Sequence, residues 1–355
     1  MTERNIATLY MKVDPVHPEQ KAIEEAALIL RRGGLVAFPT ETVYGLGANA
    51  LDGQAVARIF KAKGRPSDNP IIVHVAGREQ VSALIESLPV TAEMLMDAYW
   101  PGPLTLVLPV GEMVPQEVTA GLRTVAVRMP DHPVALALIR AAGVPVAAPS
   151  ANMSGRPSPT SAKHVLEDLN GRIEAVLDGG PAGVGVESTV LDMTSKVPVI
   201  LRPGGITPED LRDVLGEVDV DPAAAAGFSK VETPRSPGMK YVHYAPLAPL
   251  RLVIGKPEAA ALKIKELAGK EKARGRKVGI LSFSKNDDFS HYGEVVIAGC
   301  REKPETVAAG LYSALRRFND LGVDIIFAEG LEELGVGLAV MNRLKKAAGG
   351  HIIIV

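Results

Sequence analysis

The chain has 355 residues, of which 46% are apolar, and its 39 Lys and Arg residues against 41 Asp and Glu residues give a formal net charge of −2. This length accommodates two domains with separate hydrophobic cores. The charged fraction of 23% is that of a globular protein and excludes extended disorder. The weak net charge argues against a nucleic-acid clamp, which normally carries a basic stripe.

The single cysteine, Cys300, excludes an internal disulfide and any metal site built from several cysteines. We expect its side chain to be buried or half-buried as a small apolar group. The first fifteen residues carry charges where a signal peptide needs an apolar core. Because no apolar run reaches the length of a membrane span either, these features predict a cytoplasmic protein without a membrane segment.

The N-terminal part of the chain predicts alternating helices and strands. Gly33 and Gly34 stop the first helix, Pro39 ends the first strand because it cannot donate to a sheet ladder, and Asp52 is suited to cap the second helix. The expected elements in order are a helix at 18–32, a strand at 35–38, a loop at 40–47, a helix at 52–63 and a strand at 71–75.

Two cations, Lys63 and Arg65, follow the second helix in a turn that contains Gly64, Pro66 and Pro70. Arg offers a bidentate fork and Lys a point charge, so the pair suits a polyphosphate. The same two residues would also suit a solvated helix C-terminus, where cations complement the helix dipole. The pair therefore needs a partner motif before it indicates a site.

The middle of the chain continues the α/β pattern. Trp100 is expected to anchor the core or a lid, and Thr207 with Pro208 predicts the start of a helix. The other expected elements are helices at 80–87 and 91–98, strands at 104–108 and 124–129, a helix at 133–142, and strands at 144–148, 175–177, 189–193 and 199–201. This order predicts an open α/β sheet.

Polar residues follow several of these strands, which is where open α/β sheets bind ligands. Ser150 and Asn152 leave one strand, Glu187 to Thr189 opens another, and Arg128 and Arg202 end two more. Each of these features alone is a weak indication of a binding site, because Ser and Asn are ordinary turn formers. His74 on its strand is more often a core histidine than a ligand or base. No arrangement of residues indicates a covalent nucleophile.

Composition changes after residue 216, and a second α/β pattern begins at Arg251. We therefore expect a domain at 1–216, a linker at 217–250 and a small, mostly parallel α/β domain at 251–355. Its expected elements are strands at 252–254, 277–283, 324–328 and 352–354, and helices at 257–269, 305–321 and 336–348.

Several motifs together carry a family resemblance. They are PTETVYGLG, Lys63-Gly64-Arg65, Asn69-Pro70, Ser150-Ala151-Asn152, ESTV followed by RPG, the linker SPGMKYVHYAP and the tail GVGLAVMNRLKKAA. In this order they resemble the YrdC-like family in its long two-domain form, the L-threonylcarbamoyladenylate synthases, over nearly the whole chain. Val242 stands in the linker where the family pattern has a basic residue.

The resemblance implies a twisted open mixed sheet with flanking helices around a cationic cavity, plus a small Rossmann-like C-terminal domain. It implies synthesis of threonylcarbamoyl-AMP and pyrophosphate from L-threonine, bicarbonate or CO2, and ATP. Downstream threonylcarbamoyl-transfer proteins would then modify tRNA, with at most weak tRNA contact by this chain. It further implies Mg2+ bound with ATP and no metal site built from protein residues.

The resemblance also implies roles for individual residues. Threonine would be held by Thr42, His74, Arg128, Ser150 and Ser188. ATP would be held by Arg65, Asn69, Thr124, Asn152, Thr160, Arg202 and Tyr241. The catalytic residues would be Lys63, Arg65, Ser150 and Asn152, with Lys63 neutralising phosphate charge. Residues 236–246, including Tyr241, would form a lid that protects the labile carbamate from water.

Three alternative functions fit the sequence less well. A module of the same fold that binds double-stranded RNA or tRNA would show steep salt dependence, which the weak net charge disfavours. A carbamoyl-transferring maturation factor needs zinc-type cysteine clusters, which one cysteine excludes. A paralogue acting on another substrate is disfavoured by the complete linker and tail.

Overall fold

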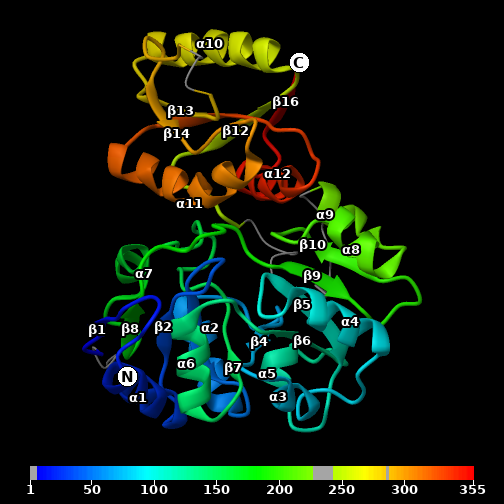
Figure 1. Ribbon diagram of the computed structural model, residues 1–355. Coiled ribbons are helices and arrows are strands. Elements are labelled where there is room, and N and C mark those ends of the chain that lie inside the picture. Colours follow the sequence, from blue (N-terminus) through cyan, green and yellow to red (C-terminus); the bar gives the residue numbers. More distant parts are fainter. Residues whose placement is uncertain (1–5, 227–242, 285–287) are drawn as a thin grey trace.

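The computed structural model describes residues 6–226, 243–284 and 288–355, and these form two sheets with separate sets of helices (Figure 1). In the described residues the larger sheet has 11 strands in the order β1-β8-β2-β3-β7-β4-β6-β5-β9-β10-β11, and the smaller has five in the order β14-β13-β15-β12-β16. The larger sheet mixes parallel and antiparallel pairs, for example β4 parallel to β6 and antiparallel to β7. The predicted fold class is confirmed.

The strands of the larger sheet come from the whole first part of the chain. They are β1 (Leu9–Lys12), β2 (Val36–Phe38), β3 (Gly45–Asn49), β4 (Ile72–His74), β5 (Leu104–Pro109), β6 (Thr124–Arg128), β7 (Val146–Ala147), β8 (Ala175–Asp178), β9 (Thr189–Asp192), β10 (Val199–Arg202) and β11 (Asp219–Val220). The helices around it are α1 (Gln20–Arg31), α2 (Gly53–Lys63), α3 (Arg78–Ser82), α4 (Val90–Tyr99), α5 (Gln116–Thr119), α6 (Pro133–Ala142), α7 (Ala162–Leu169), α8 (Pro208–Leu215) and α9 (Pro222–Ala226).

Local sequence explains where α2 begins and ends. The Asp52 side chain accepts hydrogen bonds from the backbone N–H groups of Gln54 and Ala55, as an N-cap should. Gly64 ends the helix at φ 60°, a left-handed conformation that glycine adopts without steric cost. This turn directs the chain sideways, so Arg65 leaves the helix axis and lies near the strand ends.

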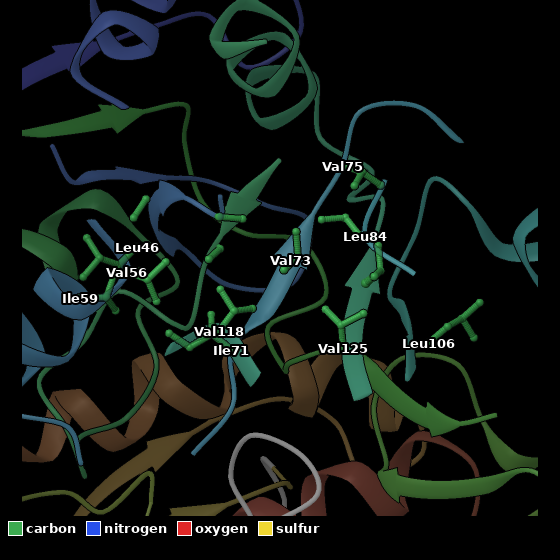
Figure 2. Packing of buried hydrophobic residues seen from close by; sticks show 14 of the residues in the cluster. Leu46, Val56, Ile59, Ile71, Val73, Val75, Leu84, Leu106, Val118 and Val125 are labelled. Carbon is green, nitrogen blue, oxygen red and sulfur yellow. The ribbon is translucent and has the colours of Figure 1, made fainter. Parts of the chain in front are cut away.

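Part of the largest core cluster lies between α2 and the sheet (Figure 2). Val56 and Ile59 on one face of α2 belong to the same cluster as Ile71 and Val73 around β4, and all four are at most 1% exposed. Burying side chains of this size contributes roughly 1.5–3 kcal/mol each. The core therefore holds the ends of β4 and α2 in a fixed relation.

The second sheet is all parallel, as its alternating pattern predicts. Its strands are β12 (Leu250–Ile254), β13 (Val278–Ser282), β14 (Glu294–Ile297), β15 (Ile325–Glu329) and β16 (Ile352–Ile354), and its helices are α10 (Pro257–Ala273), α11 (Pro304–Leu321) and α12 (Val336–Ala347). Helices α11 and α12 lie between this sheet and the larger domain, whereas α10 covers the opposite face (Figure 1).

The two domains share a hydrophobic cluster. Val43 and Val186 from the first domain and Tyr244 pack with apolar residues of the C-terminal domain such as Leu311. Gly185 approaches α11 so closely that a Cβ atom there would lie 2.4 Å from the carbonyl oxygen of Ala308. The C-terminal domain is therefore packed directly against the segment that precedes β9.

Several expectations from the sequence differ from the structure. The loop expected at 40–47 is shorter than predicted, because β3 begins at Gly45. Cys300 is exposed, not buried or half-buried. The elements β1, α5, α7 and β14 were not predicted. Helix α3 is only five residues long, and β11 and α9 lie within the first ten residues of the range expected to be linker. Trp100 belongs to the core, at 9% exposure.

No helix among the described residues combines the length and apolar composition needed to cross a bilayer.

Candidate active site

A cavity opens at the strand ends of the larger sheet, beside the C-terminal domain. Its lining brings together residues that are far apart in the sequence: Thr40, Thr42, Val43, Gly45, Arg65, Ile72, His74, Arg128, Ala148, Pro149, Ser150, Asn152, Glu187, Ser188, Arg202, His243 and Tyr244. Eight of the residues expected from the sequence are in this set, namely Thr42, Arg65, His74, Arg128, Ser150, Asn152, Ser188 and Arg202.

Three arginines reach the cavity from different elements. Arg65 comes from the turn after α2 and donates from Nη2 to the carbonyl oxygens of Asn69 (3.2 Å) and Pro70 (3.1 Å). Arg128 ends β6 and Arg202 ends β10, and both are at most 5% exposed. Buried cations are costly unless they meet anions or acceptors. Their convergence therefore favours an anionic ligand.

Arg128 is held in place by three groups. Its Nη1 donates to the hydroxyl of Thr42 (3.0 Å), its Nε donates to the carbonyl oxygen of Gly102 (3.2 Å), and its Nη2 lies 2.6 Å from Oε1 of Glu41. Glu41 was not identified from the sequence, although it belongs to the motif PTETVYGLG. This arrangement fixes the plane of the guanidinium in the direction of the cavity.

Arg202 is bonded to Ser188, which opens the neighbouring strand. Its Nε donates to the backbone oxygen of Ser188 and its Nη2 to the hydroxyl, both at 3.1 Å. The same hydroxyl lies 2.7 Å from the hydroxyl of Thr105 on β5. Two residues expected to bind different substrates, Ser188 and Arg202, thus form one hydrogen-bonded wall of the cavity.

His74 ends β4, and its ring is buried, with 4% exposure. Burial, reinforced by the nearby Arg128, lowers the pKa of His74 to about 3, so the imidazole is neutral at physiological pH. Its Nδ1 has no hydrogen-bond partner among the described residues. Unpartnered buried polar atoms are rare in proteins, so this nitrogen is suited to a polar group of a ligand.

Lys63 does not line the cavity. Its Nζ donates to the carbonyl oxygens of Ser150 and of Asn152, the latter at 2.6 Å. Burial and the neighbouring Arg65 lower the pKa of Lys63. The amine of Lys63 therefore holds the backbone of the Ser150–Asn152 segment, and the expected neutralisation of phosphate charge stays a prediction.

Three other expected residues that the structure describes, Asn69, Thr124 and Thr160, do not line the cavity. Asn69 is buried and its side-chain amide has no hydrogen-bond partner among the described residues, but it does not line the cavity. Thr124 begins β6 and is half-buried. The Thr160 hydroxyl lies 3.1 Å from that of Ser313 in the C-terminal domain. Tyr241 falls outside the described residues, as does most of the expected lid at 236–246.

The described end of that segment does reach the cavity, through His243 and Tyr244. Glu187 is a further lining residue that sequence reasoning did not identify as functional. Its carboxylate accepts hydrogen bonds from Tyr312 and Arg343 of the C-terminal domain. The only sequence signal for Glu187 was its place beside Ser188 in the motif ESTV.

The two sheets and the arginine-lined cavity define a two-domain α/β protein with a binding site for anionic ligands. Residues 28–204 match the family model described as telomere recombination, and residues 206–349 match that of the threonylcarbamoyl-AMP synthase C-terminal domain. The threonylcarbamoyl-AMP synthase of Pyrococcus abyssi is 53% identical over 337 residues, covering 94% of this chain and 96% of the relative. The chain belongs to the threonylcarbamoyl-AMP synthase family, as the motifs predicted.

Two further comparisons agree with this assignment. The threonylcarbamoyl-AMP synthase of Bacillus subtilis is 52% identical over 341 residues, which is 96% of each chain. A crystal structure of P. abyssi Sua5 complexed with L-threonine has a TM-score of 0.92 at 53% identity, covering 98% of this chain and 100% of the other. The similarity thus extends over both domains.

Proposed function

We propose that this chain is an enzyme that joins L-threonine, bicarbonate or CO2, and ATP to give threonylcarbamoyl-AMP and pyrophosphate for tRNA modification. The observation that carries the proposal is the convergence of Arg65, Arg128 and Arg202 on one cavity. The substrates are a carboxylate, a carbonate and a polyphosphate, so the cavity has the charge that they require. The relatives' shared name and the threonine complex of the P. abyssi protein support the same reaction.

The threonine site is proposed at Thr42, His74, Arg128, Ser150 and Ser188, which all line the cavity. Arg128 suits the carboxylate of threonine because its fork can bind two oxygens. The unpartnered Nδ1 of His74 and the hydroxyl of Ser188 suit the polar groups at the other end of the substrate.

The nucleotide site is proposed at Arg65, Asn69, Thr124, Asn152, Thr160, Arg202 and Tyr241. Arg65, Asn152 and Arg202 line the cavity and carry most of this assignment. Asn69 adds a buried amide with free hydrogen-bonding capacity among the described residues. Lys63, Arg65, Ser150 and Asn152 are proposed as the catalytic residues, and the amine of Lys63 also positions the latter two through their backbone oxygens.

The chemistry needs no nucleophile from the protein. The neutral amine of threonine attacks the carbon of CO2 or bicarbonate, forming a C–N bond and a carbamate, with loss of a proton or of water. A carbamate oxygen then attacks the α-phosphorus of ATP, and the bond to the leaving pyrophosphate breaks. The protein contributes alignment and stabilisation of the charge that develops on the phosphates.

Mg2+ is proposed to enter with ATP. No group of three His, Cys, Asp or Glu residues among residues 6–226, 243–284 and 288–355 could hold a metal ion. Glu41 and Glu187 beside the cavity are already engaged with Arg128 and Arg343. Since Mg2+ is commonly bound by substrate phosphates and waters, the residues present fit a metal carried by the nucleotide.

Further parts of the proposal concern the setting of the enzyme. Its product would pass to separate threonylcarbamoyl-transfer proteins, and the chain itself would contact tRNA weakly at most. We propose a cytoplasmic location and the ranges 1–216, 217–250 and 251–355 for the first domain, the linker and the C-terminal domain, with β11 at the start of the linker range still paired to the larger sheet. His243 and Tyr244 in the cavity lining support a linker that closes over the site.

Pyrophosphate release tests the reaction. ATP and Mg2+ are supplied with threonine and bicarbonate each present or omitted, and release is expected only when both are present. Arg65→Ala should lower the rate by at least about 100-fold, since it removes a cation from the phosphate site. The matched control is Arg78→Ala, an exposed arginine paired with Asp97 away from the cavity.

Release that is indifferent to threonine would contradict the proposed substrate. Absence of release together with salt-sensitive binding of double-stranded RNA would favour an RNA-binding module instead.

A further inference from the structure

Arg343 on α12 is fully buried, and its guanidinium contacts three separate segments of the chain. Its Nε donates to Oε2 of Glu187 (2.8 Å), and its Nη1 donates to the carbonyl oxygen of Pro203 (2.7 Å). The guanidinium carbon lies 5.7 Å from the centre of the Tyr244 ring. One side chain of the C-terminal domain therefore connects the start of β9, the end of β10 and the end of the linker.

Each of these three segments contributes directly to the cavity lining. Glu187 precedes Ser188, Pro203 follows Arg202, and Tyr244 itself lines the cavity. Arg202 is bonded twice to Ser188, so the two form one wall. Arg343 holds the backbone behind both members of this wall, because Nη2 also donates to the backbone oxygen of Glu187 (3.3 Å).

The carboxylate of Glu187 is the centre of the contact. It accepts hydrogen bonds from the hydroxyls of Ser158 (2.5 Å) and Tyr312 (2.8 Å) as well as from Arg343. Burial alone would raise the pKa of Glu187, but Arg343 and Arg202 lower it to about 2. The buried ion pair is therefore fully charged at neutral pH, and removing one partner leaves an uncompensated charge.

We propose that Arg343 is a positioning residue for the reaction: it fixes Ser188 and Arg202 relative to each other, so the C-terminal domain sets the geometry of the substrate site. This inference rests on the proposed function. An apolar side chain could fill the same volume at the interface, but it could not bind two backbone carbonyls and a carboxylate together. Lysine offers a point charge without the planar fork, so it cannot replace these contacts either.

The test compares Arg343→Lys with Arg301→Lys in the full-length protein. Arg301 also pairs with a buried carboxylate, Glu329 (3.2 Å), but within the C-terminal domain and away from the cavity. Thermal midpoints and the kinetics of pyrophosphate release are measured for both variants. We expect kcat/KM for threonine to fall about 30-fold in Arg343→Lys, as for a small misplacement of reacting groups, and to stay near the wild-type value in Arg301→Lys.

An unchanged kcat/KM in folded Arg343→Lys, or an equal loss in Arg301→Lys, would overturn the inference. If Arg343→Lys does not fold, the kinetics of Tyr312→Phe are measured instead. This change removes a hydroxyl that donates a hydrogen bond to the carboxylate of Glu187. A several-fold rise in the KM for threonine then supports the positioning role, and an unchanged KM overturns it.

Calorimetric titration with threonine separates this inference from the proposed function. Wild-type enzyme that binds threonine but releases no pyrophosphate contradicts the proposed reaction alone. The positioning role is then judged by the dissociation constants, which should rise in Arg343→Lys and not in Arg301→Lys. Equal dissociation constants in the two variants would overturn it.

Discussion

Arg128 and Glu41 form an ion pair at the edge of the cavity, with Nη2 of the arginine 2.6 Å from Oε1 of the glutamate and side chains only 4% and 13% exposed. The other nitrogens of Arg128 are engaged with Thr42 and Gly102. A substrate carboxylate that binds Arg128 therefore has to displace Glu41 or share the guanidinium with it. This contact makes Glu41 a competitor of the proposed substrate.

Glu41→Gln should lower the KM for threonine several-fold. The amide keeps the size of the side chain but removes the negative charge that competes for Arg128, and charged hydrogen bonds are worth roughly 1.5–3 kcal/mol. Initial rates of pyrophosphate release over a range of threonine concentrations measure the effect. Glu79→Gln, an exposed change on α3, serves as the control. A KM that stays the same or rises would show that Glu41 does not compete.

Acid should destabilise the protein below about pH 6.5, in part through His74. Its folded pKa of about 3 lies below the ordinary unfolded value of 6.5. The folded state therefore binds fewer protons, and the stability contributed above pH 6.5 is lost as the pH falls toward 3. For this single group the loss between pH 7 and pH 5 is about 2 kcal/mol. Burial and then nearby cations also lower the pKa of His243 to about 3, so it acts in the same direction.

Denaturant unfolding of His74→Gln at pH 7 and pH 5 isolates this contribution. The variant should lose about 2 kcal/mol less stability between the two pH values than the wild type does. His351→Gln, at an exposed position, should behave like the wild type. An unchanged difference in His74→Gln would mean that folding does not lower the pKa of His74.

Arg316→Lys should raise the KM for ATP more than the KM for threonine. Arg316 on α11 donates from Nη2 to Oδ2 of Asp168 (2.8 Å) and to the carbonyl oxygen of Pro157 (2.6 Å). The same carboxylate accepts from the backbone N–H of Met153 (3.1 Å), the residue after Asn152. Loosening this support should displace Asn152, which is proposed to bind the nucleotide, by a fraction of an ångström.

The expected rise in the KM for ATP is about tenfold, because a lysine cannot make the forked contact. Arg317→Lys is the matched control, since the neighbouring arginine pairs with Asp320 on the surface. Equal KM values for ATP in the two variants would show that Arg316 does not support the nucleotide site.

The sequence was most informative where local signals agreed with one another. Helix α2 combines apolar spacing at Val56 and Ile59 with an N-cap at Asp52 and a left-handed glycine at Gly64. Strand β3 was missed because Gly45–Asn49 has few β-forming side chains. Its pairing depends on β7 (Val146–Ala147), which lies far along the chain, as well as on the nearby β2.

The candidate site was predictable to the extent that its motifs stand at strand ends. The family resemblance identified eight residues of the cavity lining, but not the contacts of Lys63, whose amine lies against a segment 87 residues away. The partners of Glu187 could not be predicted either, because they also lie far from it in the sequence. Tyr312 and Arg343 follow it by 125 and 156 residues, and only the packing of the two domains brings them together. The prediction that Cys300 is buried or half-buried was wrong, because the apolar tendency of cysteine does not decide how exposed one particular residue is.

Gly185→Ala should show how much the close contact between the two domains contributes to activity, because the change leaves every polar side chain in place. Gly185 has φ +78°, and a Cβ atom there would lie 2.4 Å from both the carbonyl oxygen of Ala308 and the Cα of Ala309. Both are backbone atoms, so α11 itself has to shift away from the first domain. We expect a lower thermal midpoint and at least a tenfold loss of threonine-dependent pyrophosphate release, roughly the effect of a small misalignment of reacting groups.

Gly183→Ala is the control for this change. It lies two residues away, and a Cβ atom there meets nothing within 4 Å. The control should keep the wild-type rate and midpoint, because alanine adds no steric conflict at that position. A Gly185→Ala variant that matches the control in both measurements would show that the close contact with α11 does not matter for the site. A lowered thermal midpoint with an unchanged rate would mean that the contact contributes to stability but not to catalysis.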